Sequence, residues 1–420
     1  MTEPTLPGGS RVGDDPEAAP PRWWSWLAAW PVAAVFVLSN AATPLYALWQ
    51  RDIGFGKGTL TVIFACYIAG LIGSLLVCGV LSDRIGRKRV LVPAVLLALL
   101  ACGVFAAADS VPALMLARLL TGIAVGAAVS AGMAAVTEVA GAARRRLAAL
   151  LASCAMVLGA GTGPLLAGVF SQELPGPTST VFVVVAVLLL GALLVVLRMP
   201  LPPREAAVAG GPRIREPRIR VPRVPRGNGR QLVLGIAVFA PGITATSFVL
   251  SLGPALLASL LGGVGGGGSR ILAGAVAFAM FLAATGVQFA VRRLSRRVIL
   301  LAGAASTALA MFALVAAVRG HAVALLVVAA LLAGAGQGLG QFGGLSLLNA
   351  NVPAHCLAEA NAALNVGGYL LAGTLPVAAG FLGDAIGLTG GTTVFGATLM
   401  LLAVLGGALV VVKRSWVKAS

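Results

Sequence analysis

A short charged stretch, GVLSDRIGRKR at residues 79–89, lies between two long apolar runs. Asp83 is its single acid and stands among bases that include Arg84 and Arg87. Charged groups between apolar runs of this length must sit at a membrane face, where arginines can contact an anionic leaflet. Gly79 and Gly86 allow a tight reversal and a close contact between helices. These residues predict a hinge at the membrane surface.

Two more charges, Arg118 and Glu138, belong to one apolar run at 112–139. A separation of 20 residues corresponds to about 30 Å along a helix, so the two cannot pair with each other. Arg118 lies about two turns inside the run, where an ionised group is rare and usually functional. The alternative is a structural arginine that binds carbonyl groups of the first apolar run.

Small residues and a proline recur in the run at 147–170, at Gly159, Gly163, Pro164 and Gly168. Missing side chains let a neighbouring helix approach, and a proline inside a helix loosens its hydrogen bonds and allows a bend. A related sequence, GTLPVAAG, occurs at 373–380. A role in general helix packing therefore stays open beside a specific functional role.

Large polar side chains are sparse in the apolar runs. Asn40, Tyr46, Gln337 and Gln341 are the first candidates to line a central cavity. The alternative is that a buried amide only bridges two helices. No nucleophile, base and orienting group converge, so we expect no enzyme activity, no metal and no cofactor.

The composition requires these groups to be positioned by membrane helices. Of the 420 residues, 59% are hydrophobic and only 10% are charged, with a mean hydropathy of +0.99. Soluble proteins have about a quarter charged residues, so we expect an all-α polytopic membrane protein. Twelve spans of membrane length follow, with a break expected in the seventh at Pro241 and Pro254. They are 27–49, 59–81, 90–108, 112–139, 147–170, 179–198, 231–261, 271–291, 298–318, 322–348, 357–382 and 389–412.

The net charge of +17 follows the topology and does not indicate a nucleic-acid partner. Placing the N-terminus in the cytoplasm puts 25 of the 30 Lys and Arg residues on the cytoplasmic side and four on the other. Both termini are then cytoplasmic, with a disordered tail at 1–26 and a short tail at 413–420. We expect a multi-pass protein of the bacterial plasma membrane, the cell inner membrane.

A Pro/Arg-rich linker at 199–230 separates a six-helix bundle at 27–198 from a second bundle at 231–412. The linker is interpreted as a solvated tether, or alternatively as a contact for anionic lipid. An offset of 212 residues relates the two halves: GTGPLLAG at 161–168 matches GTLPVAAG at 373–380 at five of eight positions. At the same offset, Gly122 and Gly126 correspond to Gly334 and Gly338. We expect two pseudo-symmetric bundles.

With twelve spans in two halves, the chain resembles the major facilitator superfamily from its first span to its last. The 79–89 stretch matches that family's G-x-L-a-D-r-x-G-r-k signature, and RLLTGIAVG at 118–126 matches its R-x-x-x-G-x-x-x-G pattern. Residues 159–168, GAGTGPLLAG, resemble the motif of the antiporter branch, with Ala167 in place of one glycine. The resemblance implies a major facilitator fold and alternating access.

The resemblance also implies roles for single residues. Asp83 would cap the N-terminal end of the eleventh span in an outward-open state, and Arg87 would pair with Glu138, so that the 79–89 stretch and Glu138 form a conformational switch. Arg118 would couple substrate and proton movement, and the motif at 159–168 would seal the outer half of the pore. The second half departs from the pattern, because Arg296 stands where an acid would fall.

The leading hypothesis is a monomeric secondary transporter for proton-coupled efflux of drug-like or apolar compounds, a multidrug resistance activity. The first span lacks the mid-membrane acid that many proton-coupled exporters have, which counts against it. An uptake permease or facilitator for a neutral metabolite such as a sugar is the alternative, which the amide side chains suit. A non-transporting membrane sensor is a third hypothesis. In the transporter hypotheses the two halves rock about a small-molecule substrate within the lipid bilayer.

Overall fold

The structure is a computed structural model that describes residues 21–141, 144–201, 225, 227–262, 268–353 and 356–417. Within these residues, twelve helical segments are long and apolar enough to cross a membrane, which confirms the predicted spans to within a few residues at their ends. The predicted N-terminal tail and linker lie mostly outside the described residues, although the first helix already begins at Arg22.

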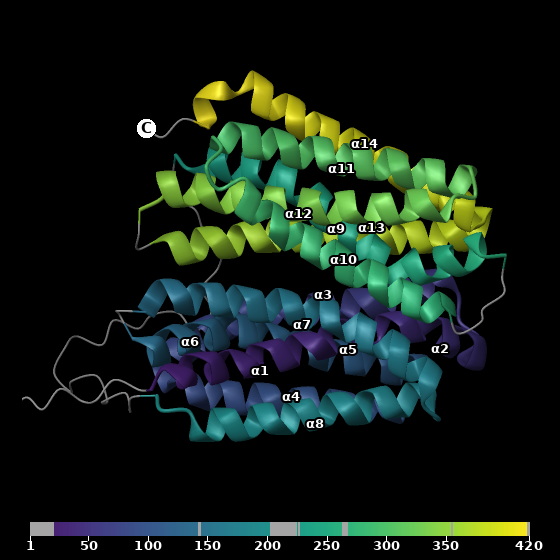
Figure 1. Ribbon diagram of the computed structural model, residues 1–420. Coiled ribbons are helices and arrows are strands. Elements are labelled where there is room, and N and C mark those ends of the chain that lie inside the picture. The colour runs from purple at the N-terminus through teal and green to yellow at the C-terminus, as the bar shows by residue number, and fades with distance from the viewer. Residues whose placement is uncertain are drawn as a thin grey trace, which may run out of the picture.

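The helices of the first half are α1 (Arg22–Ala41), α2 (Tyr46–Ile53), α3 (Lys57–Ile85), α4 (Arg87–Ala106), α5 (Val111–Ala127), α6 (Met133–Ala140), α7 (Arg145–Glu173) and α8 (Pro177–Arg198). Those of the second half are α9 (Gly229–Leu260), α10 (Gly268–Ala290), α11 (Arg296–Arg319), α12 (Val323–Asn351), α13 (Leu357–Ile386) and α14 (Leu388–Val412). A short 3₁₀ turn, η5 (Arg414–Trp416), follows α14. Figure 1 shows the two halves as separate bundles, purple to teal and green to yellow.

The bundles have two distinct ends. One end carries most of the arginines, in the loops at 86–89, 144–146 and 292–297, and we call it the basic end. The other, called the opposite end, carries the loops at 54–56, 107–110, 174–176 and 387. The first helix begins and the last helix ends at the basic end (Figure 1).

The outermost helices, α8 and α14, present apolar side chains to the surroundings. On α8 the exposed residues follow a helical spacing of three and four, which places them on one stripe. They are Val183, Val187, Leu190, Leu194 and Leu197. An apolar stripe of this kind is stable against lipid, so the chain is a multi-pass membrane protein.

The internal repeat has a matching pattern of contacts in each half. A Cβ atom added to Gly126 of α5 would lie 2.8 Å from the Cβ of Ser74, so these helices pack at backbone distance. In the second half, a Cβ on Gly338 of α12 would lie 2.8 Å from the carbonyl carbon of Ala284 in α10. The glycine pairs at an offset of 212 residues therefore join equivalent helices, the fourth to the second and the tenth to the eighth.

Prolines interrupt the helices differently from the prediction. The first span is broken at Pro44, where a 3₁₀ turn, η1 (Thr43–Leu45), separates α1 from α2. The predicted break at Pro241 and Pro254 was wrong, because α9 runs through both prolines without interruption. Pro241 leaves the carbonyl of Ala237 without its helical donor, and Gly406 of α14 packs directly on that carbonyl. A close neighbouring helix therefore covers the unpaired carbonyl of Ala237.

The fourth span also contains a feature that the sequence did not predict. A π-helical segment, Ala128–Gly132, joins α5 to α6. The wider turn rotates α6, with Glu138, relative to α5, with Arg118. Arg118 and Glu138 therefore lie on two helices that are rotated relative to each other.

Candidate functional site: a buried arginine and the contacts between the halves

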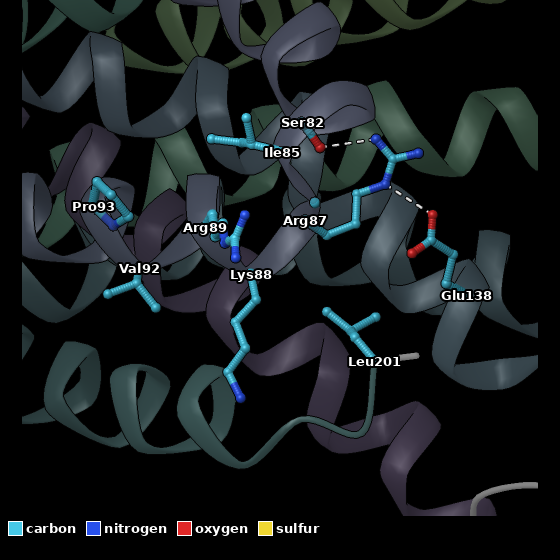
Figure 2. Close-up of a pocket in the computed structure, with 10 residues that line it drawn as sticks. Ser82, Ile85, Arg87, Lys88, Arg89, Val92, Pro93, Glu138 and Leu201 are labelled. Carbon is cyan, nitrogen blue, oxygen red and sulfur yellow. Dashed lines mark hydrogen bonds and ion pairs between the residues drawn. The ribbon is translucent and has the colours of Figure 1, made fainter. Parts of the chain in front are cut away.

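The reversal between α3 and α4 is made by Gly86, whose φ of +99° lies in a region that other residues rarely adopt. The turn brings Arg87, the first residue of α4, next to α6. Arg87 Nε lies 2.8 Å from Glu138 Oε1, and Arg87 Nη1 donates to Ser82 Oγ at 2.8 Å. Figure 2 shows Arg87 between these two partners. The ion pair implied by the family resemblance is therefore present in the structure.

Other members of the 79–89 stretch have different surroundings. A close helix contact was expected at Gly79, and the structure shows none among the residues that it describes. A Cβ there would meet only the Cβ of Ser130, at 4.0 Å. Arg84 is exposed in the last turn of α3. Lys88 donates to the carbonyl of Leu197 at the end of α8, which fastens the loop to the sixth span. The side chain of Asp83 lies outside the described residues, so its contact with α13 stays a prediction.

Arg118 is fully buried, with 0% of its surface exposed, on α5 about 10 Å from the start of that helix. Its Nε donates to the hydroxyl of Tyr46, and its Nη1 donates to the carbonyl of Ser39 at 2.6 Å. The break at Pro44 makes this possible, because Tyr46 begins a separate helix and is not held to the direction of α1. The bond to Ser39 is the kind of carbonyl contact that the structural alternative anticipated.

Aromatic rings surround the rest of the guanidinium group. Its Cζ lies 5.1 Å from the ring centroid of Tyr46, 5.4 Å from Phe64, 5.9 Å from Phe105 and 6.0 Å from Tyr67. The negative faces of such rings stabilise a desolvated cation by about 2 kcal/mol. The sequence analysis did not identify these rings, and the signal available was only the spacing of Phe64 and Tyr67, which puts both on one face of α3.

The charge of Arg118 is nevertheless incompletely compensated. Its Nη2 is buried and has no hydrogen-bond partner. Among the residues that the structure describes, no carboxylate lies within ion-pair distance of the guanidinium. A buried charge normally requires a paired opposite charge, because leaving it unpaired costs several kcal/mol. The unpaired charge and the free Nη2 of Arg118 are therefore suited to bind an anion.

The four predicted cavity residues separate into two pairs. Tyr46 contacts Arg118, and Asn40 Nδ2 donates to Ser39 Oγ at 3.0 Å and to the carbonyl of Ala160 at 3.3 Å. Gln337 and Gln341 lie half-buried on α12 of the second half, and no described hydrogen bond links them to Arg118. The Gln337 Oε1 atom is buried without a partner, so it is a second unsatisfied polar group.

Two tyrosines connect the surroundings of Arg118 to the second half. Tyr67 of α3 and Tyr369 of α13 pack against the same two apolar clusters. Phe64 and Ile68, on the same helix as Tyr67, belong to a cluster with Phe239 of α9. One layer of aromatic side chains therefore separates Arg118 from the boundary between the halves.

The motif at 159–168 packs α7 against two helices at once. Gly159 and Gly163 face the backbone of α1, where a Cβ on Gly159 would lie 2.8 Å from the Cβ of Phe36. Gly168 faces α10 of the other half, with the carbonyl oxygen of Arg270 2.6 Å from the position of a Cβ. The carbonyl group of Pro164 lies against Gly274 of α10. This motif joins the two halves near the opposite end.

The second copy of the motif makes the equivalent contact on α13. A Cβ on Gly380 would lie 2.7 Å from the carbonyl oxygen of Lys57 in α3. Beyond it, Asp384 accepts hydrogen bonds from the backbone N–H groups of Lys57 at 2.9 Å and Gly58 at 2.8 Å. Its carboxylate thus binds the N-terminal end of α3, which attracts anions. These contacts join the two halves at the opposite end.

The role of Asp384 was not identified in the sequence analysis. The available signal was symmetry: Asp384 ends the eleventh span beside the start of the second, as Asp83 ends the second span and is expected beside the start of the eleventh. Lys57 Nζ lies 3.9 Å from the same carboxylate, which is a long ion pair whose side chains are 33% and 34% exposed.

Comparison with known protein families agrees with this architecture. The sequence pattern of the Major Facilitator Superfamily matches residues 26–286, which is more than half of the chain. The chain therefore belongs to the major facilitator superfamily. The family membership and the fold are those of membrane transporters, and neither defines a substrate.

A 3-(3-hydroxy-phenyl)propionate transporter of Escherichia coli (strain K12) is 34% identical over 131 residues. The match spans 30% of this chain and 30% of that transporter, so it concerns only part of each protein.

Solved structures show the same fold over nearly the whole chain. A bacterial homologue of the human lysosomal transporter Spinster, in an inward-facing and occupied conformation, has a TM-score of 0.73 at 14% identity, covering 94% of this chain and 96% of that chain. The nucleoside transporter NupG, crystallised as a mutant, has a TM-score of 0.71 at 12% identity, covering 92% and 99%. A D-xylose-proton symporter has a TM-score of 0.65 at 19% identity, covering 91% and 96%.

Proposed function

We propose that the protein is a secondary transporter that moves a small organic anion, with Arg118 as the buried counter-charge. The observation that supports this most directly is the fully buried guanidinium with a free Nη2 and no carboxylate partner among the described residues. An anionic substrate would supply the missing charge and accept the remaining hydrogen bonds.

The same charge disfavours cationic members of the drug-like compounds in the leading hypothesis from sequence. Two like charges about 4 Å apart repel by about 4 kcal/mol at the effective dielectric constant of a protein surface, and by more in its interior. Direction of transport is a separate question. The sequence resemblance of residues 159–168 to the antiporter motif supports proton-coupled efflux as the direction.

The rings around Arg118 favour an anion with an aromatic part. Phe64, Tyr67 and Phe105 would offer apolar and ring-face contacts beside the guanidinium. The partial likeness to a 3-(3-hydroxy-phenyl)propionate transporter points to the same class, a carboxylate attached to an aromatic ring. A neutral metabolite is the second candidate, favoured by the unsatisfied Gln337 Oε1 in the other half.

Transport would proceed by alternating access between the two halves. The excess of arginine at the basic end supports a cytoplasmic location for that end and for both termini. The opposite end would then face outward, and the contacts of Asp384, Gly168 and Gly380 would hold it shut. In this proposal the structure corresponds to an inward-facing state, and Asp83, Arg84 and Gly86 take part in the switch to the other state.

Counterflow into proteoliposomes that contain the protein tests this proposal. Labelled 3-phenylpropionate should exchange, whereas its neutral amide, which has the same shape and no charge, should not. Repeating the experiment with and without a pH gradient reports proton coupling. Exchange of neutral or cationic compounds without exchange of any aromatic carboxylate would refute the proposal.

A pair of variants locates the counter-charge. Arg118→Gln should lower exchange of the carboxylate by more than about a hundredfold, because one partner of a buried ion pair is lost. Arg51→Gln removes the same charge from an exposed position on α2 and should leave exchange unchanged. Size-exclusion chromatography of both variants separates loss of transport from loss of folding. If Arg118→Gln and the wild type exchange the carboxylate equally, Arg118 has a structural role and does not bind the substrate.

A further inference from the structure

A basic groove lies at the basic end of the second half, between the start of α11 and the 3₁₀ turn η5. It has a volume of about 680 Å³. The lining residues come from two segments that are far apart in the chain, Leu294, Ser295, Arg296 and Arg297 on one side and Arg414, Ser415 and Val417 on the other. We call it the α11 groove. It stands outside the transport site, because neither its residues nor its helix ends contact Arg118.

The charge of the α11 groove is one-sided. Arg296, Arg297 and Arg414 line it, no acid does, and none of the three arginines has an ion-pair partner among the described residues. Arg297 Nε is buried without a hydrogen-bond partner. Desolvation of an unpaired guanidinium nitrogen is unfavourable, so the groove would be stabilised by an anion that accepts from it.

The corresponding place in the first half shows what is missing. There a groove of about 830 Å³ lies at the start of α4, lined by Arg87, Lys88 and Arg89 (Figure 2). Its charge is offset by Glu138, which binds Arg87 at 2.8 Å. At the offset of 212 residues, Ala350 stands in the second half where Glu138 stands in the first. The α11 groove therefore keeps the basic side chains of the repeat without an internal carboxylate.

The α11 groove is also placed at the edge of the lipid-facing surface. Leu294 and Val298 are about half exposed on one side, and Val412 of α14 is 72% exposed on the other. Trp416 lies between two cations, with its ring centroid 5.7 Å from Arg230 Cζ and 5.5 Å from Lys413 Nζ. Exposed apolar side chains, a tryptophan next to cations, and a cluster of arginines typically occur together at a membrane interface.

We propose that the α11 groove binds the phosphate group of an anionic phospholipid from the surrounding leaflet. The acyl chains would lie along the exposed apolar side chains of α11 and α14. The headgroup would bridge Arg296 and Arg297 at the start of α11 to Arg414 in η5, and so would fasten the end of the chain to the ninth span. This assignment is independent of the transported substrate, since it uses no residue of the transport site.

Native mass spectrometry of the full chain released from nanodiscs tests the proposal. Nanodiscs of phosphatidylcholine alone are compared with nanodiscs that also contain phosphatidylglycerol, and the phosphatidylglycerol retained per protein is counted. We expect retention by the wild type. Arg296→Gln/Arg414→Gln should lower the affinity by about thirtyfold, as expected for two arginines next to an anionic lipid. Arg296→Lys/Arg414→Lys keeps the charge and should restore most of the retention.

The matched control is Arg292→Gln/Arg293→Gln, which removes two exposed arginines from the same loop outside the groove. Control and wild type should retain equal amounts of lipid. Equal loss in both double variants would show general charge attraction and would overturn the proposal. A thermal-unfolding series with inorganic phosphate in detergent distinguishes the source: if free phosphate stabilises the wild type as strongly as phosphatidylglycerol does, the site is not a lipid site.

Discussion

Asp384 provides a direct test of how the opposite end is held closed. Its carboxylate accepts two backbone N–H bonds, from Lys57 at 2.9 Å and Gly58 at 2.8 Å, and these bonds cross between the halves. Asp384→Asn keeps one neutral acceptor oxygen but loses the charge and at least one bond. Hydrogen bonds to a charged group contribute about 1.5–3 kcal/mol when well formed, and the interaction with a helix N-terminus about 0.3–1 kcal/mol.

These values must be reduced because the side chain of Asp384 is 34% exposed and its ion pair with Lys57 is long, at 3.9 Å. We therefore expect Asp384→Asn to destabilise the closed form by about 1–2 kcal/mol. Such a change shifts the equilibrium toward the open form by about fivefold to thirtyfold. A transporter that must open this end in every cycle can tolerate a contact of that size.

Distances between spin labels measure the shift. Labels are placed at Ala107, at the end of α4, and at Arg319, at the end of α11, in a background without the five native cysteines. Asp384→Asn should increase the population of the longer distance. Asp52→Asn is the control, because Asp52 pairs with Arg51 inside its own half. An unchanged distance distribution in Asp384→Asn, or the same change in the control, would refute the reasoning.

Two further predictions concern packing and the ion pair. Gly122→Ala should lower the stability by about 1–3 kcal/mol, because its Cβ would lie 2.9 Å from the backbone nitrogen of Leu71, whereas Gly79→Ala should be neutral or stabilising by about 0.5–1 kcal/mol. Thermal unfolding in detergent compares the two, and equal changes would contradict the packing described for the repeat. Glu138→Gln should reduce the initial transport rate by about fivefold, since Arg87 loses a charged partner that is 40% exposed. The control is Glu173→Gln, which changes an exposed acid at the opposite end. If both variants transport equally fast, Glu138 takes no part in the conformational switch.

The helices could be predicted from the sequence because each span is a long apolar run with charged or glycine residues at its ends. Their interruptions could not. Pro44 breaks the first span and Pro241 does not break the seventh, although both prolines remove the same backbone donor. Gly406, which packs against the carbonyl that Pro241 leaves unpaired, is remote in sequence, so no local pattern shows this contact.

The candidate site was predictable to a similar degree. Arg118 was identified because a charge inside an apolar run is rare, and the pairing of Arg87 with Glu138 followed from the family resemblance. The rings that surround Arg118 come from three other helices, so only the tertiary structure brings them together. The contact of Asp384 with α3 depends on the relative position of the two halves, which no local pattern contains.

The short helix α2 links the closed end to the buried arginine. It has eight residues, so it is about 12 Å long and rigid over that length. Its first residue, Tyr46, binds Arg118, and just after its last residue the chain reaches Gly56, whose Cβ position lies 2.6 Å from the carboxylate of Asp384. Because η1 separates α2 from α1, α2 has a direction of its own between these two points. A movement of Gly56 when the opposite end opens would pass through α2 to the hydroxyl of Tyr46. The affinity of Arg118 for an anion would then depend on which side of the membrane is open.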